Sequence, residues 1–126
     1  MQIIKIIVQV LLALIFLMVG TMKLFTPYSE MLVTEGMTWA EEFSAGFIKI
    51  IGALEALGGL ALILSLRIKS FKVLVPLASL GFMILMIGAA YTHWEREEPI
   101  ATNVILFIVS ALVLYQNRGA LARKKA

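Results

Sequence analysis

The chain has 126 residues, of which 61% are hydrophobic, a mean hydropathy of +0.97 and a formal net charge of +3. Too few polar residues remain to cover a water-soluble core, so the composition excludes a soluble fold and indicates one membrane domain over residues 1–126. The basic residues cluster beside apolar segments, where membrane topology explains them, so we expect no nucleic-acid partner. The sequence has no cysteine and one histidine, so we expect no disulfide and no metal site.

Four apolar runs follow one another along the chain. The first covers residues 6–22, and no small-residue cleavage site follows it, so we interpret it as an uncleaved span. The others cover residues 47–66, 73–91 and 100–115. About 20 helical residues at ~1.5 Å each match a hydrocarbon core of ~30 Å. The sequence therefore predicts an all-α polytopic membrane protein, an antiparallel four-helix transmembrane bundle.

The one long loop, residues 25–44, is acid-rich and holds a candidate helix start. Thr38-Trp39-Ala40-Glu41 fits a capping box, in which a hydroxyl and a carboxylate each satisfy a free backbone amide. This motif predicts that the second helix starts as early as Trp39, with Trp39 and Phe43 as interfacial anchors.

Proline and glycine mark the third and fourth spans. Pro76 lies in the first turn of the third span, and Pro99 occupies a plausible first position of the fourth, where a missing N–H costs little. Gly81, Gly88 and the Ala89-Ala90 pair are expected to be further close-packing positions.

The charges predict the orientation in the membrane. Lysine and arginine gather at Lys5, in the loop 67–72 and in the C-terminal tail, whereas residues 25–44 and 92–98 are acidic on balance. Cytoplasmic flanks carry an excess of positive charge, so both termini are expected in the cytoplasm, and a bacterial inner membrane fits this pattern. The tail residues concerned are Arg118, Arg123, Lys124 and Lys125.

Glu55 stands near the middle of the second span. A carboxylate at this depth costs ~2.5–3.5 kcal/mol on insertion scales, so it is expected to face protein, water or an opposite charge. Gly52, Ala56 and Gly59 share its helical face and would let another helix approach closely. Two interpretations of Glu55 stay open at equal weight: a functional group, or a polar contact that only holds helices together.

Polar side chains from all four spans converge in the outer half of this predicted bundle. They indicate a polar pocket or an ion-pair network that opens outward, with Met22, Phe47 and Trp94 among its apolar walls. Glu55 is expected to pair with Lys23, which comes from another helix, or with Lys49 if the second helix bends. His93 is interpreted as an interfacial anchor rather than a proton-handling group, and no catalytic residue is identified. The candidates are Lys23, Lys49, Glu55, Tyr91, His93 and Asn103.

Two segments carry a family resemblance. Gly20-Thr21-Met22-Lys23-Leu24 and Gly52-Ala53-Leu54-Glu55-Ala56-Leu57-Gly58-Gly59-Leu60 resemble the DoxX-like family of small four-span membrane proteins. The resemblance implies a four-helix bundle, with the Gly-x-x-Lys and Glu-x-x-Gly-Gly positions on Gly20, Lys23, Glu55, Gly58 and Gly59. Some relatives are membrane subunits linked to quinone-dependent sulfur oxidation or to oxidoreductase complexes, and a eukaryotic branch resembles assembly helpers for ion-channel receptors.

These features favour a non-catalytic membrane subunit or helper. Its outward pocket is expected to bind a quinone or another lipophilic molecule beside an oxidoreductase partner. The alternative is a membrane chaperone whose Lys–Glu pair is purely structural. A small transporter ranks lower, because the spans show no broken helix and no inverted repeat. Membrane lipid and a protein partner or a second copy of the chain are the expected contacts.

Overall fold

The computed structural model describes residues 2–122, and the regular structure in this range is helical. The four long helices are α1 (Gln2–Phe25), α3 (Ala45–Leu64), α4 (Leu74–Glu95) and α5 (Ala101–Asn117). The short elements are α2 (Tyr28–Met31), η1 (Thr38–Glu42), η2 (Lys69–Phe71) and α6 (Gly119–Ala122). The predicted all-α fold class is confirmed. Arg123, Lys124 and Lys125 of the basic tail lie outside the described residues.

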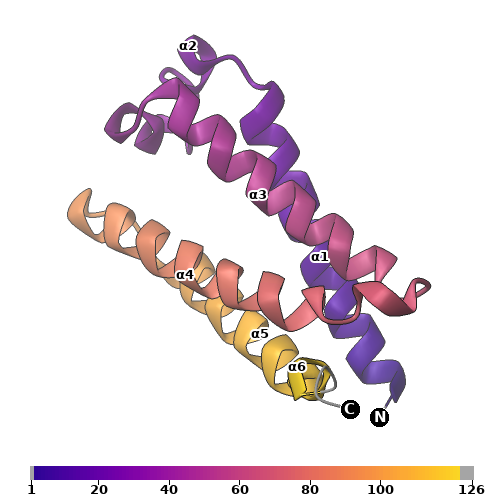
Figure 1. Ribbon diagram of the computed structural model, residues 1–126. Helices are drawn as coiled ribbons and strands as arrows, with labels where there is room; N and C mark the ends of the chain where they lie inside the picture. The colour runs from indigo at the N-terminus through magenta and orange to yellow at the C-terminus, as the bar shows by residue number, and fades with distance from the viewer. Residues whose placement is uncertain (1, 123–126) are drawn as a thin grey trace.

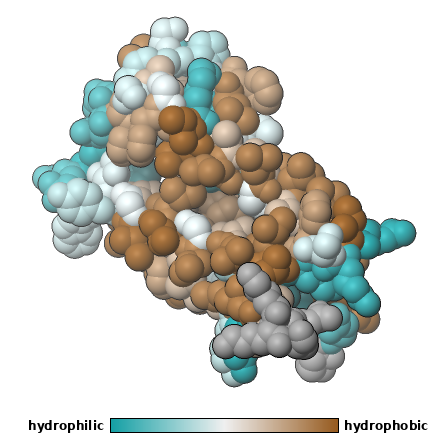
Figure 2. Space-filling model, viewed as in Figure 1, coloured by the Kyte–Doolittle hydropathy of each residue, from teal (hydrophilic) through white to brown (hydrophobic). Residues whose placement is uncertain are grey.

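The long helices have the length and apolarity of membrane spans. By these two criteria α1, α3 and α4 can cross a membrane, and α5 is apolar with 17 residues. At ~1.5 Å per residue, α5 covers about 26 Å, at the short end of the range for a spanning helix. Figure 2 shows the corresponding surface, an apolar band between polar residues at the two ends.

The four helices form two antiparallel pairs, α1 with α3 and α4 with α5 (Figure 1). The pairs meet at the end that holds both termini and the α3–α4 connection, which we call the narrow end. They diverge toward the end that holds α2, η1 and the α4–α5 turn, which we call the wide end. The stacked rings of Phe16 and Phe82, 3.8 Å apart, join the pairs through the main core. The buried residues of this core are Leu12, Ala13, Phe16, Leu62, Val75, Phe82, Met86 and Val113.

Glycine lets α1 and α3 touch through their backbones. A Cβ atom at Gly20 would lie 2.5 Å from the Ala56 nitrogen and 2.6 Å from the Gly52 oxygen. A Cβ atom at Gly59 would lie 2.7 Å from the Ala13 oxygen. These distances are too short for any side chain, so the predicted small-residue face of α3 is the surface that packs on α1.

Glycines at three other positions differ in their surroundings. A Cβ atom at Gly58 would lie 2.7 Å from the Phe82 ring, so this glycine makes room for α4. At Gly81 and Gly88 a Cβ atom would have no other described residue within 4 Å, so the expectation that they are close-packing positions is wrong. The reason is the rotation of α4 about its axis, which directs a different row of residues toward the core. That row is Val75, Ser79, Phe82 and Met86.

The helix α3 starts later than the capping-box motif predicts. Its N-cap is Ser44, whose hydroxyl oxygen accepts a hydrogen bond from the Phe47 nitrogen at 3.1 Å. Trp39 belongs to the separate element η1. Phe43 has an extended backbone conformation and so interrupts the helical conformation between η1 and α3. The Thr38 hydroxyl accepts a hydrogen bond from Arg96 instead of capping a helix. A distant partner therefore overrides the local capping preference.

The two prolines have different outcomes. Pro76 lies in the first turn of α4, as predicted. Pro99 precedes α5, which begins at Ala101, so its predicted place at the first helical position is wrong.

A polar contact that the sequence did not indicate closes the narrow end. The buried Gln9 amide of α1 donates to the Leu62 oxygen at 2.7 Å and to the Ser65 hydroxyl at 3.0 Å. The Lys72 ammonium donates to the backbone oxygen of Ser65 at 3.0 Å. Two of these bonds end on backbone carbonyls at the end of α3, Leu62 and Ser65, where the regular bonding of the helix stops.

Candidate functional site

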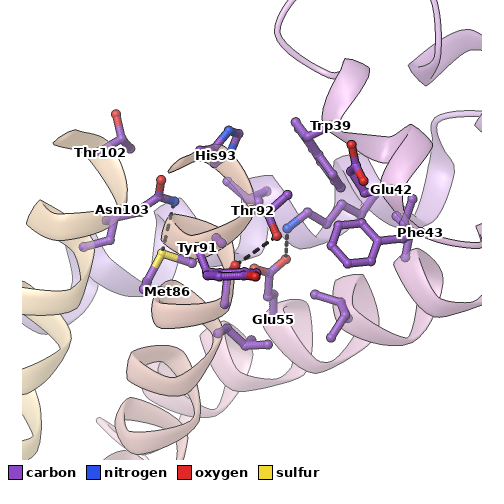
Figure 3. A pocket seen from close by; sticks show the side chains of 18 of the residues that line it. Trp39, Glu42, Phe43, Glu55, Met86, Tyr91, Thr92, His93, Thr102 and Asn103 are labelled. Atoms are coloured by element: carbon purple, nitrogen blue, oxygen red, sulfur yellow. Dashed lines mark hydrogen bonds and ion pairs between the residues drawn. The ribbon is translucent and has the colours of Figure 1, made fainter. Parts of the chain in front are cut away.

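A cavity of about 910 Å³ lies between the two helix pairs in the wide half of the molecule. Its walls come from α1, η1, α3, α4 and α5, and Phe16 lies at its border with the main core. Figure 3 shows the arrangement, with Trp39, Glu42 and Phe43 on one side and the α4 and α5 side chains facing them. The volume suits one drug-sized or lipid-derived molecule.

Lys23 and Glu55 form an ion pair in the wall of this cavity. The Nζ atom of Lys23 on α1 lies 2.8 Å from the Oε1 atom of Glu55 on α3. The Glu55 side chain is 1% exposed and that of Lys23 is 15% exposed. Of the two lysines that stayed open as partners, the structure therefore places Lys23 on Glu55. Lys49 is exposed and donates to the Leu24 oxygen at 2.9 Å instead.

The glycine contact between α1 and α3 explains why the pair can form. A Cβ atom at Gly52 would lie 2.7 Å from the Cβ atom of Lys23, so only glycine lets the lysine stem pass along α3 at this level. Glu55 follows Gly52 by three residues and therefore lies on the same face. Packing and pairing are thus two consequences of one close helix approach.

The Trp39 ring of η1 lies over the lysine, and two further rings extend this aromatic wall. The Lys23 Nζ atom lies 5.4 Å from the centre of the Trp39 ring, within the range of a cation–π interaction. Phe43 contacts the edge of Trp39 and stacks on Phe47, with ring centres 6.3 Å and 5.3 Å apart. Trp39 was predicted as an interfacial anchor, and the structure makes it part of the cavity wall.

Further predicted residues reach the cavity from α4 and α5 (Figure 3). Tyr91 lines it while remaining 67% exposed, and Asn103 places its amide nitrogen 3.9 Å from the Met86 sulfur. His93 also lines the cavity and lies 2.7 Å, through Nδ1, from a Glu98 carboxylate oxygen. Of the six candidates, Lys23, Glu55, Tyr91, His93 and Asn103 come together at the cavity and Lys49 does not.

Two of the three apolar wall residues expected from the sequence are misplaced. Phe47 lines the cavity, whereas Met22 and Trp94 do not. Both side chains are exposed on the outside of the helices, as the Trp94 side chain at 68% exposure shows. Both residues lie in the half of the molecule that holds the cavity, as predicted. Hydropathy does not specify the rotation of each helix about its axis, so it did not show that these side chains face outward.

Arg96 joins the two helix pairs at the wide end. Its guanidinium donates to Glu41 at 2.6 Å and Glu42 at 2.9 Å on η1, and to Glu98 at 3.1 Å beside α5. We call Arg96 and these three carboxylates the Arg96 cluster. Glu97, with a φ of 60°, turns the chain sharply after α4 and so places Arg96 and Glu98 side by side.

The Arg96 cluster is held by charge. Hydrogen bonds to Glu41 and then to Glu98 raise the pKa of Arg96, so it stays a cation at any working pH. The hydrogen bond with His93, followed by that with Arg96, lowers the pKa of Glu98 below 4.5. The cluster links η1 to the α4–α5 turn beside the cavity, to whose lining it contributes Glu42.

Acid is expected to weaken the link that the Arg96 cluster makes between η1 and the α4–α5 turn. Because the folded pKa of Glu98 lies below its ordinary value of 4.5, its stabilisation is complete above that pH and is lost as the pH falls through the folded pKa. We expect the SDS concentration that half-unfolds the protein in mixed micelles to fall below pH ~4.5, and to fall less in Glu98→Gln. The matched control Glu95→Gln removes an exposed carboxyl that joins no ion pair among the described residues. An equal acid response in Glu98→Gln and the unsubstituted chain would contradict the assignment.

The fold and the site together define a small polytopic membrane protein that holds a buried Lys–Glu pair beside a cavity between its helix pairs. The model of the DoxX-like family matches residues 7–115, and the chain belongs to this family. The resemblance predicted from Gly20–Leu24 and Gly52–Leu60 is confirmed. No curated protein and no solved structure matches the chain.

Proposed function

We propose that this protein is a non-catalytic membrane subunit whose cavity binds a flat lipophilic molecule such as a quinone. The observation that carries the proposal is a cavity of about 910 Å³ with mostly apolar walls and one buried ion pair. Binding sites for lipophilic molecules combine apolar walls with a few fixed polar groups that orient the ligand. Lys23 and Glu55 supply such groups here.

The state of the ion pair supports binding rather than turnover. Glu55 and Lys23 hold each other at 2.8 Å, so each charge is already balanced by the other. A general acid or base must give up or take a proton during the reaction, which this pairing opposes. A redox step on the bound molecule would therefore belong to an oxidoreductase partner.

The folded segment at the wide end that holds α2 and η1, which we call the cap, favours a second candidate, a membrane chaperone or assembly helper. Met31 of α2 and Ala40 of η1 form a small core with Ile48 of α3, separate from the main core. Exposed carboxylates, among them Glu30 and Glu35, lie on this cap and offer an acidic surface for a protein partner. In that case the Lys23–Glu55 pair only stabilises the helix bundle, and the cavity does not bind lipophilic molecules.

We further propose a bacterial inner membrane with both termini in the cytoplasm. Lys5, Arg67, Lys72 and Arg118 flank the helix ends at the narrow end, whereas the acidic η1 and the α4–α5 turn lie at the wide end. The excess of positive charge on cytoplasmic flanks supports this orientation. The cavity then lies in the outer half of the bilayer.

Two glycines of α4 offer a matched test of cavity binding. Gly88 lines the cavity and Gly81 does not, and at neither position would a Cβ atom have another of the described residues within 4 Å. A side chain can therefore start at both positions without a backbone clash, and leucine favours the helix over glycine. We expect decyl-benzoquinone or its reduced form to raise the thermal midpoint of the unsubstituted chain and of Gly81→Leu, and to raise that of Gly88→Leu far less. If neither probe shifts the unsubstituted chain, the proposal fails and the assembly helper is favoured.

A further inference from the structure

The buried ion pair leaves specific hydrogen-bonding positions open. Among the residues that the structure describes, Glu55 uses only Oε1, and its Oε2 atom is buried without a hydrogen-bond partner. Within residues 2–122, Lys23 makes one hydrogen bond, to that same Oε1 atom, so N–H groups remain unused on its ammonium; its side chain is 15% exposed and lines the cavity. The pair therefore offers one acceptor oxygen and unused donors at one wall of the cavity.

An unpartnered carboxylate oxygen is the unusual part of this arrangement. Buried polar atoms in folded proteins nearly always have a partner, because an unsatisfied one loses its hydration without compensation. Figure 3 shows the Glu55 carboxylate between Phe43 on one side and Tyr91 and Thr92 of α4 on the other. A donor that arrives from the cavity is thus the group that Glu55 lacks.

The chemistry of the two open positions discriminates between polar heads. A carbonyl or ether oxygen can only accept, so it would satisfy Lys23 and leave Oε2 unpaired. A hydroxyl group both donates and accepts, so a single hydroxyl can donate to Oε2 and accept from Nζ. The head should also be neutral, because the charges of Lys23 and Glu55 already balance and a further buried charge would be uncompensated.

The access to the cavity indicates where such a molecule comes from. At the wide end, toward water, Arg96 ties η1 to the α4–α5 turn. Along the helices, Phe47 of α3 and Ile84 and Tyr91 of α4 line the cavity and are also exposed on the apolar surface. A ligand dissolved in the bilayer meets these exposed cavity-lining residues directly, whereas one in water meets the charged Arg96 cluster beside the cavity.

We infer that the Lys23–Glu55 pair binds the hydroxyl group of a neutral, membrane-dissolved amphiphile, such as a lipophilic phenol or alcohol. This inference rests on the proposed lipophile-binding function and narrows it, because it selects a reduced hydroquinone head over an oxidised quinone head. Glu55 accepts the hydroxyl hydrogen bond and Lys23 donates to the same oxygen. The apolar remainder of the molecule occupies the space between the helix pairs.

Three probes that share one tail test the inference on the unsubstituted protein in detergent micelles. These are decyl-hydroquinone kept reduced under argon, decyl-benzoquinone, and the dimethyl ether of decyl-hydroquinone. The thermal midpoint measured against probe concentration gives an apparent Kd for each. We expect the hydroquinone to bind about tenfold more tightly than the other two, because only it can donate to Oε2.

The outcomes separate this inference from the proposed function. Equal affinities for the three probes, or tighter binding of the quinone, would overturn the hydroxyl inference and leave lipophile binding intact. Binding of none of them would overturn both. In Glu55→Gln the amide oxygen can accept the hydrogen bond from Lys23, and the amide NH₂ group then faces the cavity as a donor. The tighter binding of the hydroquinone relative to the other two probes should therefore disappear. Gly81→Leu should retain it, since Gly81 lies outside the cavity wall.

Discussion

Replacing Gly20 by alanine should destabilise the bundle by about 2–3 kcal/mol, at the upper end of the usual cost of overpacking. The added Cβ would meet the Ala56 nitrogen at 2.5 Å and the Gly52 oxygen at 2.6 Å. Both are backbone atoms, so no side-chain rotation can relieve the contact, and α1 must move away from α3. In a membrane this separation is costly because close packing, rather than the hydrophobic effect, holds the helices together. SDS titration in mixed micelles, followed by circular dichroism, measures the change.

Gly81→Ala is the matched control for this experiment. It makes the same chemical change within a membrane-spanning helix, but the new Cβ would have no neighbour within 4 Å in the part of the chain that the structure describes. Alanine favours the helix over glycine by up to ~1 kcal/mol, so this variant should be at least as stable as the unsubstituted chain. If Gly20→Ala unfolds at the same SDS concentration as Gly81→Ala, the backbone contact between α1 and α3 contributes nothing to stability.

The fold was predictable because one physical requirement sets it. Backbone groups in a bilayer must be satisfied within the chain, so long apolar runs become helices, and short connections make neighbouring helices antiparallel. The start of α3 was less predictable, because Thr38 and Ser44 are both good capping residues. The choice between them depends on Arg96, which follows Thr38 by 58 residues and takes its hydroxyl as a hydrogen-bond acceptor.

The buried Lys23–Glu55 pair of the candidate site was predictable from the sequence, whereas the Arg96 cluster at the wide end was not. Glu55 is conspicuous because a carboxylate in a membrane span requires a partner, and Lys23 is the lysine that another helix brings to the same level. Arg96 gave no such signal, because a charged residue in a charged turn is ordinarily solvated. Its role depends on how far apart the two helix pairs lie at the wide end, which periodicity does not specify. The same limit explains why Trp94 was misplaced, since hydropathy gives depth but not rotation.

The Lys23–Glu55 pair should show a strong and unequal response when its members are removed singly. Lys23→Met leaves a carboxylate that is 1% exposed without its cation, and loss of one partner of a buried pair costs about 3–5 kcal/mol. Glu55→Gln should cost less, because Lys23 is 15% exposed at the cavity and keeps the Trp39 ring at 5.4 Å. The double variant Lys23→Met/Glu55→Gln should recover most of the loss, because no uncompensated charge remains.

A double-mutant cycle measured by SDS unfolding isolates the coupling between the two residues. Lys49→Met is the matched control for Lys23→Met, because Lys49 is exposed and bonds only the Leu24 oxygen among the described residues. It should cost about 1 kcal/mol or less. Additive single effects, or equal losses in Lys23→Met and Lys49→Met, would show that the bundle does not depend on this pair. A large coupling means instead that α1 and α3 are fixed in rotation as well as in distance. That fixed rotation keeps Glu55 at the cavity wall, where the proposed ligand must find it.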